Sequence, residues 1–243
     1  MQIFVEQSYF DKNIKDVSEK SEIEIISKAP KCDSYLTYDS KGLSFIGNAD
    51  NPKNFLNVNF LTGKLGWRIK RADHEGNLKK ALGRTKESLH IFDATAGLLA
   101  DSLIFLSLGH RVVAVEQSKI ICLLVNDAIH RAKNIIPFLK NIKLIHGNSI
   151  DIFKKLNACF DVVYLDPMYP VMKKNVKKSG DLDSVRSILE IEKISPDENI
   201  LIENFIKTDY KKLILKRPIK SKKIYSNINY QVKGKTTRFD IYL

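Results

Sequence analysis

The chain has 243 residues, 44% of them hydrophobic, which is enough for one large α/β domain with a small appendage. No apolar run approaches the roughly 18 residues of a membrane-spanning helix. The N-terminus carries acidic residues and lacks the basic start and apolar centre of a signal peptide. These features exclude a helical membrane protein, so we expect a cytoplasmic protein with no membrane partner.

The net charge of +12 is unevenly distributed. Residues 1–60 hold 7 lysines against 9 acidic residues, a balance of −2, whereas residues 61–243 hold 33 basic and 19 acidic residues, a balance of +14. We therefore expect a small N-terminal portion over 1–60 and a main domain over 61–243 whose charge favours a phosphate-rich partner. Alternating isoleucines at 23 and 25 and the turn-rich residues 42–52 predict a few strands in the N-terminal portion.

The main domain begins as an alternation of strands and helices. After a short helix expected at 77–82, residues 89–93 predict a strand that ends on Asp93, and residues 98–108 have the apolar pattern of a helix. The next strand, 111–116, ends on Glu116, nineteen positions after Gly97. That spacing places an acid against a ribose hydroxyl in an open α/β sheet. The Gly-x-Gly-x-x-Gly turn of a pyrophosphate-binding site is absent, which favours S-adenosylmethionine (SAM) over a nicotinamide dinucleotide.

Two further strands complete the predicted binding edge. Residues 142–146 predict a strand followed by Asn148 and Ser149, which are small and polar enough for the edge of an adenine ring. The apolar run 160–165 predicts a buried parallel strand that delivers Asp166 and Pro167 at its carboxyl end. This order predicts a doubly wound, Rossmann-like α/β fold with its ligand crevice at the strand ends.

Residues 166–169 read Asp-Pro-Met-Tyr, which is similar to the [Asp/Asn]-Pro-Pro-[Tyr/Phe] loop of enzymes that methylate exocyclic amino groups of nucleobases. Such an amine is a poor nucleophile because its lone pair is delocalised into the ring. Asp166 can accept one N–H and the Pro167 carbonyl the other, while Tyr169 can stack on the flipped base for roughly 1–3 kcal/mol. An ordinary strand-ending turn with a core tyrosine explains the same four residues.

The chain closes with helices expected at 184–194 and 198–208, a strand at 213–215, and a last antiparallel strand at 238–242. Together, residues 93–98 (DATAGL), 164–170 (YLDPMYP), 216–218 (KRP) and 238–242 (RFDIY) resemble the bacterial small-subunit ribosomal RNA methyltransferase J family. That family methylates N2 of one guanosine near the 3′ end of 16S rRNA, and the resemblance runs from about Asn59 to the C-terminus. It implies a class I SAM-dependent methyltransferase fold.

The resemblance also implies which residues contact the donor. To Asp93 and Gly97 at the first strand end it adds Ala100, Asp101, Glu116, Gln117, Asn148, Ser149 and Asp166. Two segments depart from the family pattern. The family's Gly-Leu-Gly-Arg-Asp reads Gly-Leu-Leu-Ala-Asp at 97–101, and its glycine-rich segment reads KRADHEG at 70–76. Two alternatives to guanine-N2 methylation therefore stay open: adenine-N6 methylation by the same loop, and an RNA-binding relative whose donor pocket has decayed around Leu99 and Ala100.

Basic residues next to the predicted base pocket are candidates for the phosphate backbone of 16S rRNA or of the small ribosomal subunit. They are Arg68, Lys70, Arg71, Lys173, Lys174, Lys177, Lys178, Lys216 and Arg217. A solvated lysine-rich face explains any single cluster equally well. Trp67 is expected in the core or at a hinge more than on an RNA base. The three cysteines and five histidines have no metal-ligand spacing, so we expect no metal and reduced cysteines packed as small hydrophobes.

Overall fold

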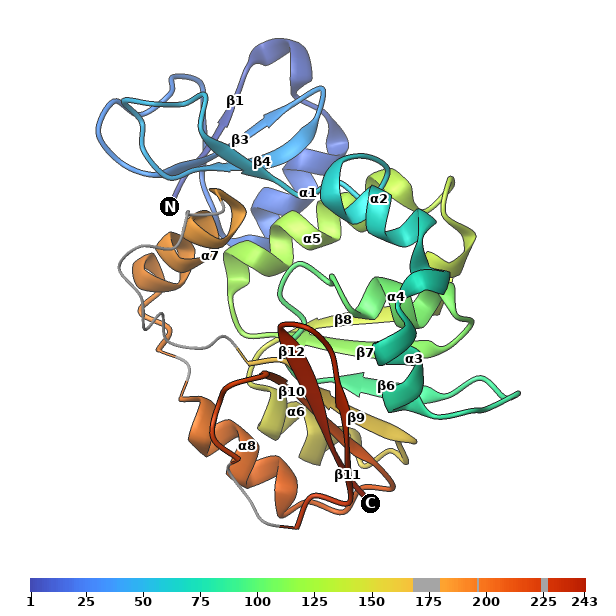
Figure 1. Ribbon diagram of the computed structural model, residues 1–243. Coiled ribbons are helices and arrows are strands. Elements are labelled where there is room, and N and C mark those ends of the chain that lie inside the picture. Colours follow the sequence, from blue (N-terminus) through green and yellow to red (C-terminus); the bar gives the residue numbers. More distant parts are fainter. Residues whose placement is uncertain (168–179, 196, 224–226) are drawn as a thin grey trace.

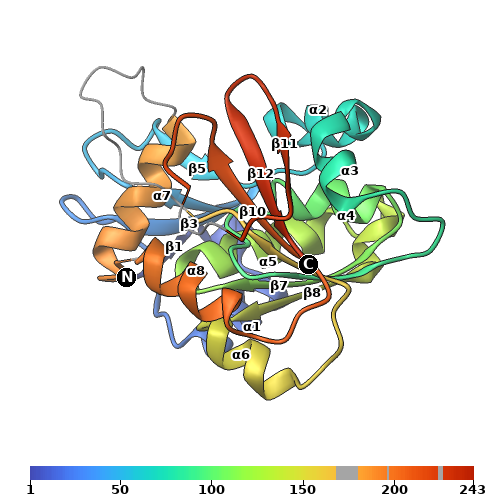
Figure 2. The same cartoon turned by 60° about the horizontal axis from the view of Figure 1, so that its bottom comes forward.

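Two β-sheets organise the chain, and the larger contains seven of the described strands in the order β11-β12-β10-β9-β6-β7-β8 (Figure 1). The computed structural model describes residues 1–167, 180–195, 197–223 and 227–243. Five strands run parallel: β6 (His90–Asp93), β7 (Arg111–Glu116), β8 (Ile142–His146), β9 (Val162–Leu165) and β10 (Leu213–Pro218). The antiparallel strands β11 (Tyr230–Lys233) and β12 (Thr237–Tyr242) extend the sheet beyond β10 (Figure 2).

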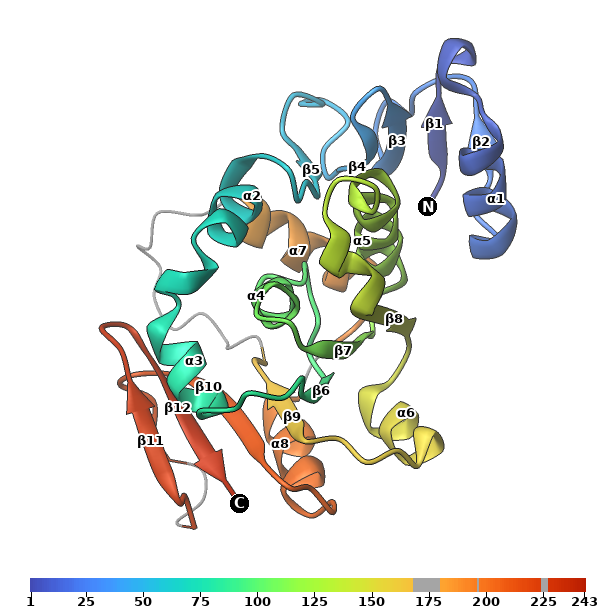
Figure 3. The ribbon, with the colours of Figure 1, turned by 90° about the vertical axis from the view of Figure 1, so that its right-hand side faces the viewer.

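Alternation along the strands assigns each side chain to one face of this sheet. Ile91, Val112 and Val162 belong to one apolar cluster, and their neighbours Phe92 and Val163 belong to the other. The first face packs on α4 (Ser102–Ser107) and α5 (Lys119–Ala132), and the second on α6 (Ser149–Leu156) and α8 (Glu198–Ile206). Figure 3 shows the two helical layers on opposite sides of the parallel strands. The predicted doubly wound fold is confirmed.

Three of the described helices that begin at the carboxyl edge of the parallel strands are capped by a side chain. Ser118 caps α5, Asn148 caps α6 and Asp197 caps α8, each accepting hydrogen bonds from backbone N–H groups of the first turn. Because parallel strands end at the same edge, the loops that carry these caps converge. This edge holds the candidate site.

The N-terminal portion forms the smaller sheet, in the order β2-β1-β3-β4-β5. Its strands are β1 (Ile3–Val5), β2 (Ile25–Ile26), β3 (Tyr35–Asp39), β4 (Gly42–Ile46) and β5 (Phe55–Asn57). Helix α1 (Lys12–Ser21) joins β1 to β2, and its Ile14 is fully buried. The strands expected here are therefore present. A single apolar cluster runs from Ile3 in this sheet to Ile241 in the larger one.

A polar contact joins the two sheets through α5. Asp127 Oδ2 accepts the backbone N–H of Leu43 at 3.0 Å and lies 2.7 Å from Nε of Arg131. Arg131 in turn donates from Nη2 to the Val58 carbonyl at 2.6 Å. Gly42 leaves room for this arrangement, since a Cβ there would meet Arg131 Nε at 2.3 Å. The β4–α5 junction thus depends on a residue without a side chain.

Helices α2 (Gly63–Lys70), α3 (Gly76–Leu82) and α7 (Gly180–Ile191) complete the described helical elements longer than one turn, with short 3₁₀ turns at Gln7–Tyr9, Ala72–His74 and Pro137–Asn141. The helix expected at 77–82 and the two expected at 184–194 and 198–208 are confirmed within a few residues. The helix expected at 98–108 is shorter, because residues 97–101 form a tight loop before α4 begins at Ser102.

Candidate active site

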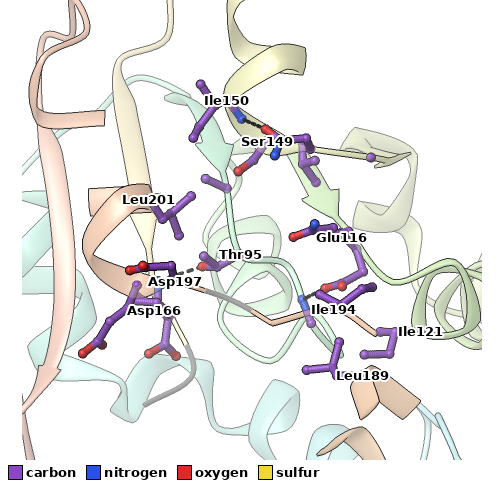
Figure 4. A pocket seen from close by; sticks show the side chains of 18 of the residues that line it. Thr95, Glu116, Ile121, Ser149, Ile150, Asp166, Leu189, Ile194, Asp197 and Leu201 are labelled. Atoms are coloured by element: carbon purple, nitrogen blue, oxygen red, sulfur yellow. Dashed lines mark hydrogen bonds between the residues drawn. The ribbon is translucent and has the colours of Figure 1, made fainter. Parts of the chain in front are cut away.

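A cavity of about 330 Å³, within the range of small-molecule sites, lies at the carboxyl edge of the parallel strands (Figure 4). The loops after β6, β7, β8 and β9 each contribute to it. From them, the residues that line the cavity include Thr95, Gly97, Glu116, Gln117, Asn148, Ser149, Asp166 and Pro167. All of these except Thr95 were expected, so seven of the eleven residues expected at the donor site or the base meet in one cavity, counting Asp166 once. Those contacts with donor and base stay predictions.

Glu116 is the central acid of the cavity. Its carboxylate accepts the backbone N–H of Gly97 at 2.8 Å and that of Ser118 at 2.8 Å. Gly97 adopts a φ of +49°, a left-handed conformation that glycine tolerates best. Burial raises the pKa of Glu116, and these two N–H donors oppose that rise. Each carboxylate oxygen keeps a second lone pair, so Glu116 can accept hydrogen bonds from a ribose diol while it holds the loop.

The rest of the cavity suits a nucleoside. Asn148 uses its side-chain oxygen to cap α6, at 2.9 Å from the N–H of Ile150, which leaves its amide N–H groups for a ligand. Apolar side chains from α5, α6, α7, the segment after α7 and α8 form the walls: Ile121, Ile150, Leu189, Ile194 and Leu201. An acid for the ribose, polar atoms for the adenine edge and apolar walls for its faces fit SAM.

Asp93 supports the cavity from beneath. It is 2% exposed and does not contribute to the lining. Its carboxylate accepts Ser102 Oγ at 2.5 Å and the N–H of Thr95 at 3.0 Å. Burial raises the pKa of Asp93 to about 7. We expected Asp93 among the donor contacts, but the structure gives it the task of holding the 94–102 loop.

The loop at residues 97–101 is intact although its sequence differs from the family pattern. Leu99 adopts a φ of +63°, the conformation that a glycine would favour, and its side chain is completely buried. The N–H of Leu99 donates to the Ala96 carbonyl at 2.8 Å, so the tight turn is closed. Burial of the leucine offsets the strain, and the donor cavity is present despite the substitutions. This geometry argues against decay of the pocket.

Asp166 follows β9 and faces the cavity with Pro167 beside it. Its N–H donates to Thr95 Oγ1 at 2.7 Å, which ties the end of β9 to the loop after β6. One carboxylate oxygen, Oδ2, lies 2.7 Å from Lys216 Nζ. Burial raises the pKa of Asp166 to about 6 even though Lys216 opposes the rise. Asp166 is ionised at neutral pH and one third exposed, so it can accept a hydrogen bond from a bound amine.

Asp101 is placed differently from expectation. It is 5% exposed and does not line the cavity, and neither does Ala100. Its carboxylate accepts from Arg68 Nη2 at 2.6 Å, Tyr164 Oη at 2.5 Å and Lys216 Nζ at 2.7 Å. Burial alone would raise the pKa of Asp101, but the two cations lower it to about 2. Asp101 thus lies behind Asp166 as a buried anion.

The candidate RNA-binding residues divide into two groups. Arg68 and Lys216 are held by Asp101, and Arg217 is 6% exposed and pairs with Glu198 at 3.1 Å, so these three side chains have structural partners instead of facing a phosphate. Lys70 and Arg71 are exposed on and just after α2.

Tyr169, Lys173, Lys174, Lys177 and Lys178 lie outside the described residues. Their expected contacts with a base or with RNA stay predictions.

Trp67 corrects an expectation. The sequence favours a position in the core or at a hinge, but the Trp67 side chain is 61% exposed. The guanidinium of Arg71 lies 4.7 Å from its ring centre. Cys32 and Cys159 are also exposed, and only Cys122 of the three cysteines is packed as a small hydrophobe. Within the described residues, no group of three or more His, Cys, Asp or Glu side chains is arranged to hold a metal ion, and none of the described helices has the length and apolarity to cross a membrane.

Sequence reasoning missed the wall of the cavity formed beyond residue 180. Leu189 and Leu201 line it, and Glu192 anchors α7 to the start of α5 through Ser118 Oγ and the N–H of Ile120. No motif marks these positions, because their contacts join segments about 70 residues apart. Only the apolar periodicity of residues 184–194 and 198–208 pointed to helices there.

Comparison with known proteins identifies the family. A family described as putative SAM-dependent methyltransferase matches residues 18–243. Ribosomal RNA small subunit methyltransferase J of Thioalkalivibrio sulfidiphilus is 31% identical over 216 residues, covering 86% of this chain and 84% of the relative. The protein of the same name from Pseudoalteromonas translucida is 34% identical over 218 residues, covering 86% and 84%.

A solved structure agrees with the sequence relatives. The SAM-dependent methyltransferase from Neisseria gonorrhoeae matches with a TM-score of 0.70 at 25% identity, covering 100% of this chain and 96% of that one. The fold, the cavity and the sequence relatives all indicate a SAM-dependent methyltransferase. The chain therefore belongs to the ribosomal RNA small subunit methyltransferase J family of SAM-dependent methyltransferases, as its motifs predicted.

Proposed function

We propose that this protein transfers the methyl group of SAM to the exocyclic N2 of a guanosine in 16S rRNA, as a cytoplasmic enzyme acting on small-subunit RNA. One observation carries the proposal. Asp166, at the carboxyl end of β9, lines the same cavity as Glu116 and Asn148, the residues that fit the donor. A carboxylate suited to an amine thus adjoins a site suited to a nucleoside with a reactive methyl group.

The residues act on the amine more than on the methyl group. SAM, when bound, supplies an activated methyl group on a sulfonium. Asp166 accepts one N–H of the guanine amine, which turns the nitrogen lone pair toward the donor and stabilises positive charge as it develops there. After transfer the amine loses its extra proton to solvent or to Asp166, so no strong base is needed. Pro167, which also lines the cavity, offers its carbonyl to the second N–H.

The RNA partner is supported by the relatives and by charge. Relatives at 31–34% identity carry a ribosomal RNA methyltransferase name. Residues 61–243 have a balance of +14, and Trp67, Lys70 and Arg71 are exposed together around α2. Aromatic and cationic side chains on one surface bind a nucleic-acid strand by stacking and by phosphate pairing.

Methyl transfer tests the proposal directly. The protein is incubated with labelled SAM and with 16S rRNA or small subunits from cells that lack the modification, and the methylated nucleoside is then identified. We expect N2-methylguanosine. Formation of N6-methyladenosine would replace the guanine assignment with the adenine alternative. Absence of both transfer and donor binding would favour an RNA-binding protein without activity.

Substitution of Asp166 tests the mechanism. Asp166→Ala removes the acceptor for the amine, so turnover falls by at least about 100-fold while donor affinity changes little, because the interaction acts chiefly in the transition state. Asp209→Asn, at an exposed carboxylate outside the cavity lining, is the matched control and keeps full activity. Near-normal N2-methylguanosine formation by Asp166→Ala would overturn the role given to this residue.

A further inference from the structure

Lys216 lies between the two carboxylates at the end of the sheet. Its Nζ is 2.7 Å from Asp101 Oδ2 and 2.7 Å from Asp166 Oδ2. Residues 165 and 215 are paired across β9 and β10, so Lys216 and Asp166 follow one step further in the same register. The lysine side chain is only 21% exposed. The parallel pairing of β9 and β10 therefore brings this cation beside the candidate catalytic acid.

Asp101 is held in place independently of Lys216. Arg68 donates to Asp101 Oδ1 at 2.6 Å, to the Ala100 carbonyl at 2.8 Å and to Glu75 at 2.6 Å. Tyr164, which is 1% exposed, donates to Asp101 Oδ2 at 2.5 Å. These contacts fix Asp101 as a buried anion that attracts Lys216. The cation is thus shared between a fixed, buried carboxylate and the one that faces the cavity.

We propose that Lys216 is the positioning residue of the methyl-transfer reaction, holding Asp166 by Oδ2 so that Oδ1 faces the target amine, with Asp101 competing for the same cation. This inference rests on the proposed function. Lys216 donates to Oδ2 of Asp166, and among the described residues no hydrogen bond reaches Oδ1, so the proposal assigns Oδ1 to a substrate N–H. Lys216 was expected at an RNA phosphate, but its two carboxylate partners give it this role instead.

The arrangement sets the pH range of activity. A protonated Asp166 accepts a hydrogen bond poorly, so turnover falls as pH drops through the pKa of Asp166, which is about 6. Burial raises this pKa, Lys216 and Arg68 lower it, and Asp101 raises it. Among the described residues, Asp93 and Tyr164 also interact electrostatically with Asp166, and Glu116, Asp197 and Glu198 line the same cavity.

Two variants move this pKa in opposite directions. Lys216→Met removes the cation, so the pKa of Asp166 rises and the acid limb of the kcat profile moves up by about one to three pH units. Asp101→Asn removes the competing anion, so Lys216 stabilises ionised Asp166 more strongly and the limb moves to lower pH. Lys216→Arg keeps a cation at this position, so the acid limb lies close to its pH in the unaltered protein. KM for RNA and the donor dissociation constant stay within about threefold of their usual values, because Lys216 acts through Asp166.

The matched control is Lys211→Met. Lys211 also pairs with an aspartate near the sheet, at 2.9 Å from Asp161, but its side chain is 66% exposed and it does not line the cavity. Its removal leaves the acid limb in place. An unshifted limb in Lys216→Met, or shifts of the same sign in Lys216→Met and Asp101→Asn, would overturn the inference.

A measurement without turnover keeps this test separate from the proposed function. The carboxyl carbon of Asp166 is followed by carbon-13 NMR as pH is varied, in the unaltered protein and in both variants. We expect the pKa to rise in Lys216→Met and to fall in Asp101→Asn even if the methylated base differs from guanine. An Asp166 pKa that is unchanged in both folded variants contradicts the role of Lys216, whatever the enzyme methylates.

Discussion

Leu99 shows how a substitution is absorbed at a single residue. Its φ of +63° costs a side-chain-bearing residue about 1–2 kcal/mol, whereas complete burial of a leucine contributes more than that. Burial therefore outweighs strain, and the loop keeps a shape suited to glycine. The sequence showed that a glycine was missing, but it did not show that the backbone conformation would be retained.

This balance predicts an unusual order of stability. Leu99→Ala empties a buried site and destabilises the fold by about 2–5 kcal/mol. Leu99→Gly loses the same side chain but removes the strain at positive φ, so it is as stable as Leu99→Ala or more stable by about 1 kcal/mol. Urea denaturation of both variants measures the difference. A glycine variant less stable than the alanine variant, as in an ordinary helix or strand, would contradict this account.

Glu116 predicts the behaviour of the donor site at the residue scale. Glu116→Ala removes the acceptor for the ribose and the partner of the Gly97 N–H, so donor binding weakens by about 1.5–3 kcal/mol. Isothermal titration with SAM measures the loss, and circular dichroism checks the fold. Glu190→Ala, at an exposed acid on α7, serves as the control and leaves affinity unchanged. Undiminished affinity in Glu116→Ala would remove Glu116 from the donor site.

At the scale of elements, the parallel strands were the predictable part of the fold. Strands β7 and β8 end where the sequence placed their ends, because the apolar residues of each strand are followed by a polar one, Glu116 in β7 and His146 in β8. Glu116, Asn148 and Asp166 therefore converge for a reason visible in the sequence, since parallel strands end at one edge. Of the described residues expected at that edge, all line the cavity except Asp93, Ala100 and Asp101, and Tyr169 lies outside the described residues.

The position of Asp101 follows from contacts with residues that are distant in the chain. Asp101 lies among Arg68, Tyr164 and Lys216, which are 33, 63 and 115 positions away in the chain. Spacing and periodicity describe near neighbours, so they do not identify a buried ion network assembled from four elements. The same limit applies to Trp67, whose exposure depends on how α2 packs against α4 and not on its own neighbours in sequence.

Helix α2 carries a prediction about RNA. Trp67→Ala removes an exposed aromatic surface and weakens binding of 16S rRNA by about 1–3 kcal/mol, while Trp67→Phe retains most of the affinity because stacking needs a ring. Filter binding at two salt concentrations measures both effects. The control is Phe10→Ala, at an exposed aromatic residue of the N-terminal portion. Equal affinities for Trp67→Ala and the unaltered protein would show that α2 does not contact RNA.

Charge acts over the whole molecule. If Lys70 and Arg71 neutralise phosphates, replacing both with alanine reduces the slope of log RNA affinity against log salt concentration by the contribution of about two phosphate contacts. The affinity for the donor stays the same. Trp67→Ala lowers affinity without changing that slope, because stacking releases no counterions. The two sets of variants thus separate electrostatic from stacking contributions. A slope unaffected by the double substitution would make this basic cluster a solvated face.

The two sheets share one apolar cluster, so the whole molecule is expected to unfold in a single transition in which the β4–α5 junction takes part. Gly42→Ala tests that junction, because a methyl group at a φ of +84° would meet Arg131 Nε at 2.3 Å and Asp127 Oδ2 at 2.4 Å. Strain and displaced partners destabilise the entire chain by at least about 2 kcal/mol. Gly76→Ala is the matched control: it meets nothing within 4 Å, lies at the start of α3, and changes stability by less than about 1 kcal/mol. Calorimetry measures the stability of the two variants. A Gly42→Ala protein as stable as Gly76→Ala would show that the sheets are not coupled through α5. A separate early transition for the N-terminal sheet would show the same.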